Sequence, residues 1–131
     1  MLSAFENRKN CLIFQCAQKL LRIGLLLQSR ISNDFTEARV ESRVSIKKDK
    51  TWLNVYIGNG DEDEVGLFEN DLINVDVTDF SINIDCTIYS NYGIDRVFSK
   101  NDMLNQFDFE IFDLLGEKIY SAMKLHIEYL I

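Results

Sequence analysis

The stretch Phe80-Ser81-Ile82-Asn83-Ile84-Asp85-Cys86-Thr87-Ile88-Tyr89, or FSINIDCTIY, decides the fold because apolar and polar side chains alternate along it without a break. Successive side chains of a β-strand point to opposite faces of the sheet, so this alternation predicts a strand with one buried and one outward face. The outward side carries Ser81, Asn83, Asp85, Thr87 and Tyr89.

The same period of two recurs elsewhere and predicts further strands. These strands are expected over residues 38–47, 52–57 and 73–78, with a short last one over 94–98. Lys48-Asp49-Lys50 and Asn91-Tyr92-Gly93 are turn signals between them. Asp79 leaves two alternatives open, one bent strand over 73–89 or two separate strands.

Helical spacing replaces this alternation at both ends of the chain. Ser3 with Glu6 three residues later matches a capping box, which predicts a first helix from there to about Gln28. Ser99 with Asp102 predicts the start of a last helix that runs to about Tyr129. The expected inner face of the first helix contains Leu12, Ile13, Cys16, Leu20, Leu21, Ile23 and Leu27.

The order helix, strands, helix with short connections predicts an α+β domain. We expect a mainly antiparallel sheet of four to five strands, flanked by an N-terminal and a C-terminal helix in two layers. The length of 131 residues suits one domain over 1–131, and the absence of proline argues against a linker.

Charge is divided unevenly along the chain. Residues 1–50 hold ten Lys and Arg against five Asp and Glu, a net of +5, whereas residues 51–131 hold four against sixteen, a net of −12. From Thr51 to Asp95 there are ten acids and no Lys or Arg. This block would repel nucleic acids and anionic lipid surfaces, so we expect neither as a partner, and it would attract a basic protein.

Cysteine and histidine content gives no sign of a cofactor or metal. Cys11, Cys16 and Cys86 form no C-x-x-C pair, and free, mostly buried thiols in a reducing compartment are the simplest interpretation. His126 is the only histidine, so a Cys/His metal site is not expected, and a place on a helix flank is the favoured interpretation. No stretch of eighteen uncharged apolar residues and no signal-peptide cleavage site is present, which favours the cytoplasm and no membrane span.

The segment Gly58-Asn59-Gly60-Asp61-Glu62-Asp63-Glu64-Val65-Gly66 raises the question of a calcium loop. In the register that starts at Asp61, Val65 and Leu72 occupy positions 5 and 12, where an EF-hand requires oxygen ligands. In the register that starts at Asn59, Glu64 replaces the glycine of position 6. A solvated connection and a docking surface for a cationic partner remain as interpretations of Asp61, Glu62, Asp63 and Glu64.

The outward sheet face supplies the candidate binding residues. Trp52, Tyr56 and Tyr89 share the phase of Asp76 and Asp85, and aromatic anchors among carboxylates are typical of protein-binding hot spots. The alternative is that a helix covers this face and hides the aromatic rings.

In its acidic block from Asp61 to Asp85 and its α–β–α order, the chain resembles the immunity proteins of bacterial contact-dependent inhibition and related toxin systems. That resemblance implies a cytoplasmic protein without enzymatic activity that neutralises a cognate basic toxin domain, commonly a nuclease. No functional residue is carried over from it. The basic first third departs from a uniformly acidic inhibitor.

Two further classes of function stay open. A small acidic chaperone of the secretion or holdase type would expose apolar surface and form an oligomer. An enzyme would need a site assembled only in three dimensions, for example from His126 with Cys86 or an acid.

Overall fold

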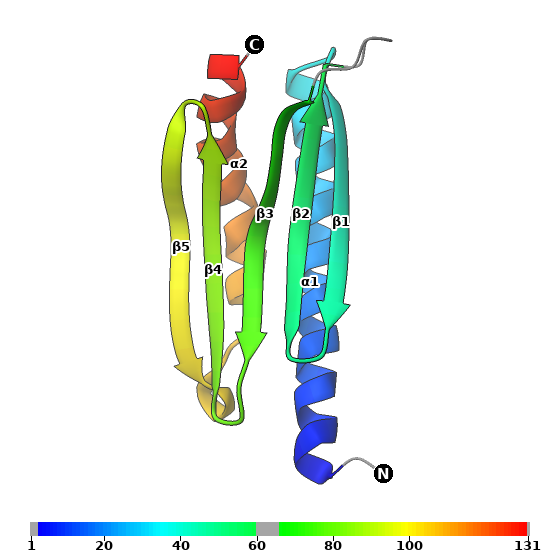
Figure 1. Ribbon diagram of the computed structural model, residues 1–131, viewed down its shortest axis with the longest axis vertical. Helices are drawn as coiled ribbons and strands as arrows, with labels where there is room; N and C mark the ends of the chain where they lie inside the picture. Colours follow the sequence, from blue (N-terminus) through cyan, green and yellow to red (C-terminus); the bar gives the residue numbers. More distant parts are fainter. Residues whose placement is uncertain (1–2, 60–65, 131) are drawn as a thin grey trace.

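The computed structural model describes residues 3–59 and 66–130 of the chain. Five antiparallel strands follow one another in the order β1-β2-β3-β4-β5 (Figure 1). The strands are β1 (Arg39–Lys47), β2 (Lys50–Gly58), β3 (Gly66–Val77), β4 (Ser81–Ser90) and β5 (Gly93–Met103), and the helices are α1 (Ala4–Asp34) and α2 (Ile111–Leu130). The predicted α+β fold, with an antiparallel sheet between an N-terminal and a C-terminal helix, is confirmed.

Helix α1 begins where the capping box predicts. The Ser3 hydroxyl accepts a hydrogen bond of 3.1 Å from the backbone N–H of Glu6. The helix continues to Asp34, six residues beyond the expected end at Gln28. Residues 29–34 are polar except for Ile31, which lies one turn after Leu27 and is fully buried. The packing of Ile31 therefore extends the helix.

One residue that was expected in the core of α1 is exposed. Leu21 is 49% exposed, because the inward positions are taken by residues 13, 16, 20, 23, 27 and 31. Consecutive residues of a helix are separated by about 100° of rotation, so a helix that buries Leu20 turns Leu21 towards its flank.

Strands β3 and β4 are two strands joined by a tight turn at 78–80, which decides between the two alternatives for residues 73–89. The Thr78 hydroxyl accepts hydrogen bonds from the backbone N–H groups of Phe80 and Ser81, at 3.3 and 3.0 Å. A Thr side chain that bonds the backbone two or three residues ahead stabilises such a turn.

The predicted start of the last helix at Ser99 is wrong. Strand β5 continues through this region to Met103, a single 3₁₀ turn follows over Leu104–Gln106, and α2 starts only at Ile111. Residues 99–103 pair with β4 from Asp85 back to Ser81. Inter-strand hydrogen bonds to a neighbour distant in sequence therefore prevail over the local helix-start signal of Ser99 and Asp102.

Both helices lie on one face of the sheet, so the molecule has two layers with one core between them (Figure 1). Strand β3 pairs with β4 only between residues 73–77 and 82–86. Beyond that point the side chain of Asn70 bridges the two strands, donating to the carbonyl of Tyr89 at 2.6 Å and accepting from its N–H at 3.1 Å. This amide pair replaces one missing rung of the ladder.

Candidate partner-binding face

The surface of the sheet opposite the helices is the candidate site, and we call it the open face. Leu53, Val55 and Ile57 of β2 are buried under the helices, whereas Trp52, Asn54 and Tyr56 alternate with them and point the other way. Within residues 3–59 and 66–130, no helix lies over this face (Figure 1). Between the two alternatives drawn from the sequence, the described residues support the uncovered face.

Strand register places three of the predicted residues, Trp52, Asp76 and Asp85, close together. Trp52 pairs with Asn74, and Asn74 pairs with Asp85, so these three residues form one row across β2, β3 and β4. Strands lie about 4.8 Å apart, which puts the backbones of Trp52 and Asp85 about 10 Å apart on the same face. Asp76 follows Asn74 by two residues along β3 and therefore shares the face.

Tyr56 and Tyr89 lie in the other half of the sheet. Tyr56 is four residues beyond Trp52 on β2, opposite Glu41 and Glu69. Tyr89 is 54% exposed near the end of β4 and pairs with Ile94 of β5. The separation of β3 from β4 lies between these tyrosines, so Tyr56 and Tyr89 are on different sides of it.

Carboxylates of the open face already have polar partners. Asp76 forms an ion pair of 3.5 Å with Lys50, and Asp85 accepts a hydrogen bond of 3.0 Å from the Thr87 hydroxyl. Asp71, which sequence reasoning did not select, accepts from the Asn54 amide at 3.0 Å. The exposed ion pair of Asp76 contributes about 0–1 kcal/mol, so this carboxylate stays available to a cationic partner.

Strand β1 supplies the opposite charge on the same face. Arg39, Glu41, Arg43, Ser45 and Lys47 alternate with Val40 and Val44, which pack towards the core. Arg39 and Glu41 form an ion pair at 3.0 Å. The open face therefore has a basic edge on β1, aromatic rings on β2 and acids on β3 and β4. The basic and the acidic parts of the sequence thus lie on the same surface of the sheet.

The predicted docking residues Asp61, Glu62, Asp63 and Glu64 lie outside the described residues. They belong to the connection that follows β2 and precedes β3, two strands that carry Trp52, Tyr56 and Asp76. In the described part of the chain, no group of three or more His, Cys, Asp or Glu side chains has an arrangement that could hold a metal ion.

A second polar cluster lies under the β4–β5 hairpin, and sequence reasoning found only its histidine. His126 of α2 is fully buried, contrary to the expected place on a helix flank. Its Nε2 lies 2.8 Å from the Asp95 carboxylate, and its Nδ1 is hydrogen-bonded to the hydroxyl of Ser90. A carboxylate only accepts, so in a neutral imidazole Nε2 carries the proton and Nδ1 accepts from the Ser90 hydroxyl.

Tyrosine rings enclose this cluster. Tyr92 packs edge-on against the imidazole at a ring distance of 5.0 Å, and Tyr129 packs on Tyr92 at 5.4 Å. The backbone N–H of Tyr92 also donates to the Ser90 hydroxyl at 3.1 Å. Serine, histidine and aspartate come from β4, α2 and β5, so no sequence motif could have revealed them.

Comparison with known proteins assigns no family to the chain. No family model, no curated protein and no solved structure matches it. Among residues 3–59 and 66–130, one helical segment, Glu6–Asp34 of α1, is long and apolar enough to cross a membrane by length and composition alone. The core helix of a soluble protein meets the same criterion, and the apolar stripe of α1 packs on the sheet.

Proposed function

We propose that this chain is a protein-binding domain that holds a basic partner against its open face, and that it neutralises a toxic protein in the manner of an immunity protein. One observation carries the proposal, which is the uncovered sheet face where Trp52 and the acids of β3 and β4 lie together. Interfaces derive most of their binding energy from a few aromatic and charged anchors in such a setting.

The charges favour a basic partner. Glu69, Asp71, Asp76 and Asp85 line β3 and β4, next to the aromatic side chains of β2. Complementary charge of this kind accelerates association and selects the partner, while the aromatic contact limits dissociation. Association should therefore slow as salt is added, because salt screens exposed charges.

The test is capture of partners from the source cells with three immobilised proteins, of which only one is altered on the open face. The full chain and a double variant with Trp52→Ala and Asp85→Lys are compared, with Glu128→Lys on the outer side of α2 as the matched control for added charge. We expect one basic protein, retained in a one-to-one ratio by the parent and the control, and lost by the double variant.

Co-expression then tests inhibition. The captured protein should arrest growth when it is produced alone, and the parent chain and Glu128→Lys should relieve the arrest while the double variant does not. A harmless partner, or equal relief by all three proteins, would refute the proposed function. Retention of many unfolded proteins regardless of Asp85 would indicate a holdase chaperone instead.

A hydrolase is the second candidate, and the hydrogen-bond chain Ser90–His126–Asp95 is the specific observation that favours it. A base that accepts from a serine hydroxyl and is oriented by a carboxylate is the arrangement that activates a nucleophile. A fluorophosphonate probe should then form a Ser90 oxygen–phosphorus bond, with loss of fluoride and transfer of the proton to His126. Absence of labelling, or labelling that persists in Ser90→Ala, would exclude this candidate, and Ser121→Ala on α2 is the control.

A further inference from the structure

An apolar pocket lies where the first turns of α1 extend past the end of the sheet. It has a volume of about 260 Å³. Three parts of the chain line it, namely α1 with Arg8, Lys9 and Leu12, the β3–β4 turn with Asp79 and Phe80, and the end of β5 with Met103, Leu104 and Asn105. None of the predicted residues of the open face belongs to this pocket.

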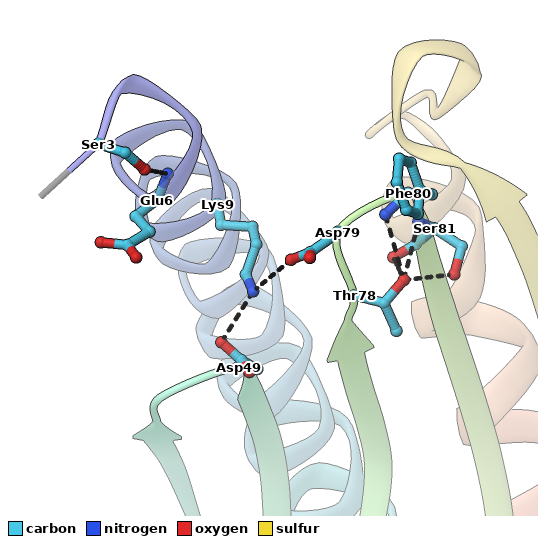
Figure 2. A network of polar contacts seen from close by, with 8 residues as sticks. All are labelled: Ser3, Glu6, Lys9, Asp49, Thr78, Asp79, Phe80 and Ser81. Carbon is cyan, nitrogen blue, oxygen red and sulfur yellow. Dashed lines mark hydrogen bonds and ion pairs between the residues drawn. The ribbon is translucent and has the colours of Figure 1, made fainter.

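Polar contacts fix the rim of the pocket (Figure 2). Lys9 Nζ lies 3.2 Å from the Asp79 carboxylate and 3.3 Å from that of Asp49, which joins α1 to the β3–β4 and β1–β2 turns. The hydrogen bonds to the Thr78 hydroxyl hold the backbone of Phe80 from one side. The N–H of Leu104 donates to the Phe80 carbonyl at 3.0 Å and holds it from the other.

This fixed rim keeps apolar side chains in water. Phe80 is 78% exposed and Met103 is 55% exposed, although both border the pocket. Hydrogen bonds on both sides hold the backbone of Phe80 in the turn, outside the core. Large apolar side chains around a hollow of this kind are typical of a site that covers them with a ligand.

One cation at the pocket lacks a partner. Lys9 is shared by two carboxylates and its side chain is only 14% exposed. Arg8 is exposed and lines the same pocket, and its guanidinium makes no hydrogen bond or ion pair with another residue in the described ranges. A guanidinium beside apolar walls recognises a carboxylate that carries an apolar tail.

The volume of the pocket limits the size of the ligand. A volume of 260 Å³ equals that of about nine water molecules in the liquid, which corresponds to a chain of about eight carbon atoms. We propose that the pocket binds a medium-chain monocarboxylate, with the carboxylate on Arg8 and the chain along Leu12, Phe80 and Met103.

Titration of the ¹⁵N-labelled full chain with sodium octanoate tests this proposal by NMR. We expect saturable shifts of the amide signals of Leu12, Phe80 and Leu104, with a Kd on the order of 1 mM for a ligand of this size. Octylammonium and 1-octanol serve as probes of opposite and of no charge, and both should bind about tenfold more weakly than octanoate.

Two variants locate the site, each with a matched control. Arg8→Gln should raise the Kd for octanoate about tenfold, whereas Arg96→Gln, at an exposed position of β5, should not. Phe80→Ala should also raise it, whereas Phe14→Ala, which removes another exposed ring from a part of α1 outside the pocket, should not.

Three results would overturn the proposal. The first is the absence of saturable shifts at the pocket residues. The second is equal binding of octanoate, octanol and octylammonium, and the third is an unchanged Kd in Arg8→Gln. The open-face variant with Trp52→Ala and Asp85→Lys should bind octanoate like the parent chain, so failure here and failure of the proposed function are separable.

Discussion

Burial should make two of the three cysteine thiols unreactive. Cys16 and Cys86 are fully buried, and this burial raises the pKa of each thiol to about 12. Only the thiolate reacts readily, so these two residues should resist iodoacetamide at about pH 8 while exposed Cys11 reacts. Mass spectrometry should find one label on the folded chain and three in urea. Labelling of Cys86 in the folded chain would contradict the buried position.

The alternation of single residues predicted which side chains of β2, β3 and β4 share a face. It could not predict their neighbours, because the row of Trp52, Asn74 and Asp85 depends on strand register. Nor could it reveal that Ser90 and Asp95 meet His126, since contact between three distant elements leaves no local pattern.

At the scale of an element, the spacing between α1 and the sheet depends on Gly24. A Cβ atom there would lie 2.7 Å from the Ser42 hydroxyl and 3.1 Å from a methyl group of Leu53. Gly24→Ala gains up to about 1 kcal/mol of helix propensity, but a forced shift of packed layers costs about 1–3 kcal/mol. We expect net destabilisation of about 1 kcal/mol, measured by urea unfolding.

Gly116 of α2 provides the matched control. A Cβ atom there would meet only the end of the Leu26 side chain, at 3.4 Å. Gly116→Ala should therefore be neutral or stabilise the protein by up to about 1 kcal/mol. If both variants were stabilised alike, close approach at Gly24 would not set the position of α1.

The elements also show where local sequence reasoning fails. The cap of α1 and the alternating strands were predicted correctly because hydrogen bonding and amphipathicity there are local. Residues 99–103 were assigned to a helix because Ser99 and Asp102 imitate a cap, and the ladder with β4 that overrides this signal is invisible along the chain. The end of α1 was missed because Ile31 stands alone among polar residues.

On the scale of the whole molecule, Lys9 joins three parts that are distant in sequence. Hydrogen bonding to Asp79, supported by Asp49, raises the pKa of Lys9 above 10.5 despite the opposing effect of desolvation. The folded protein thus holds this proton more tightly than the unfolded chain does. The stabilisation from Lys9 is therefore complete below about pH 10 and is lost as the pH rises through the folded-state pKa.

Replacement of Lys9 by methionine tests this junction, because it removes the charge and leaves Asp49 and Asp79 facing each other without a cation. We expect Lys9→Met to lower the free energy of unfolding at about pH 8, and the difference from the parent chain to shrink as the pH rises beyond about 10.5.

Lys47→Met, on the exposed end of β1, should cost nothing measurable at either pH. Urea unfolding across this pH range measures the differences, in which other titrating groups cancel. A difference that stays constant up to about pH 12 would show that Lys9 acts through the packing of its aliphatic stem rather than through its charge.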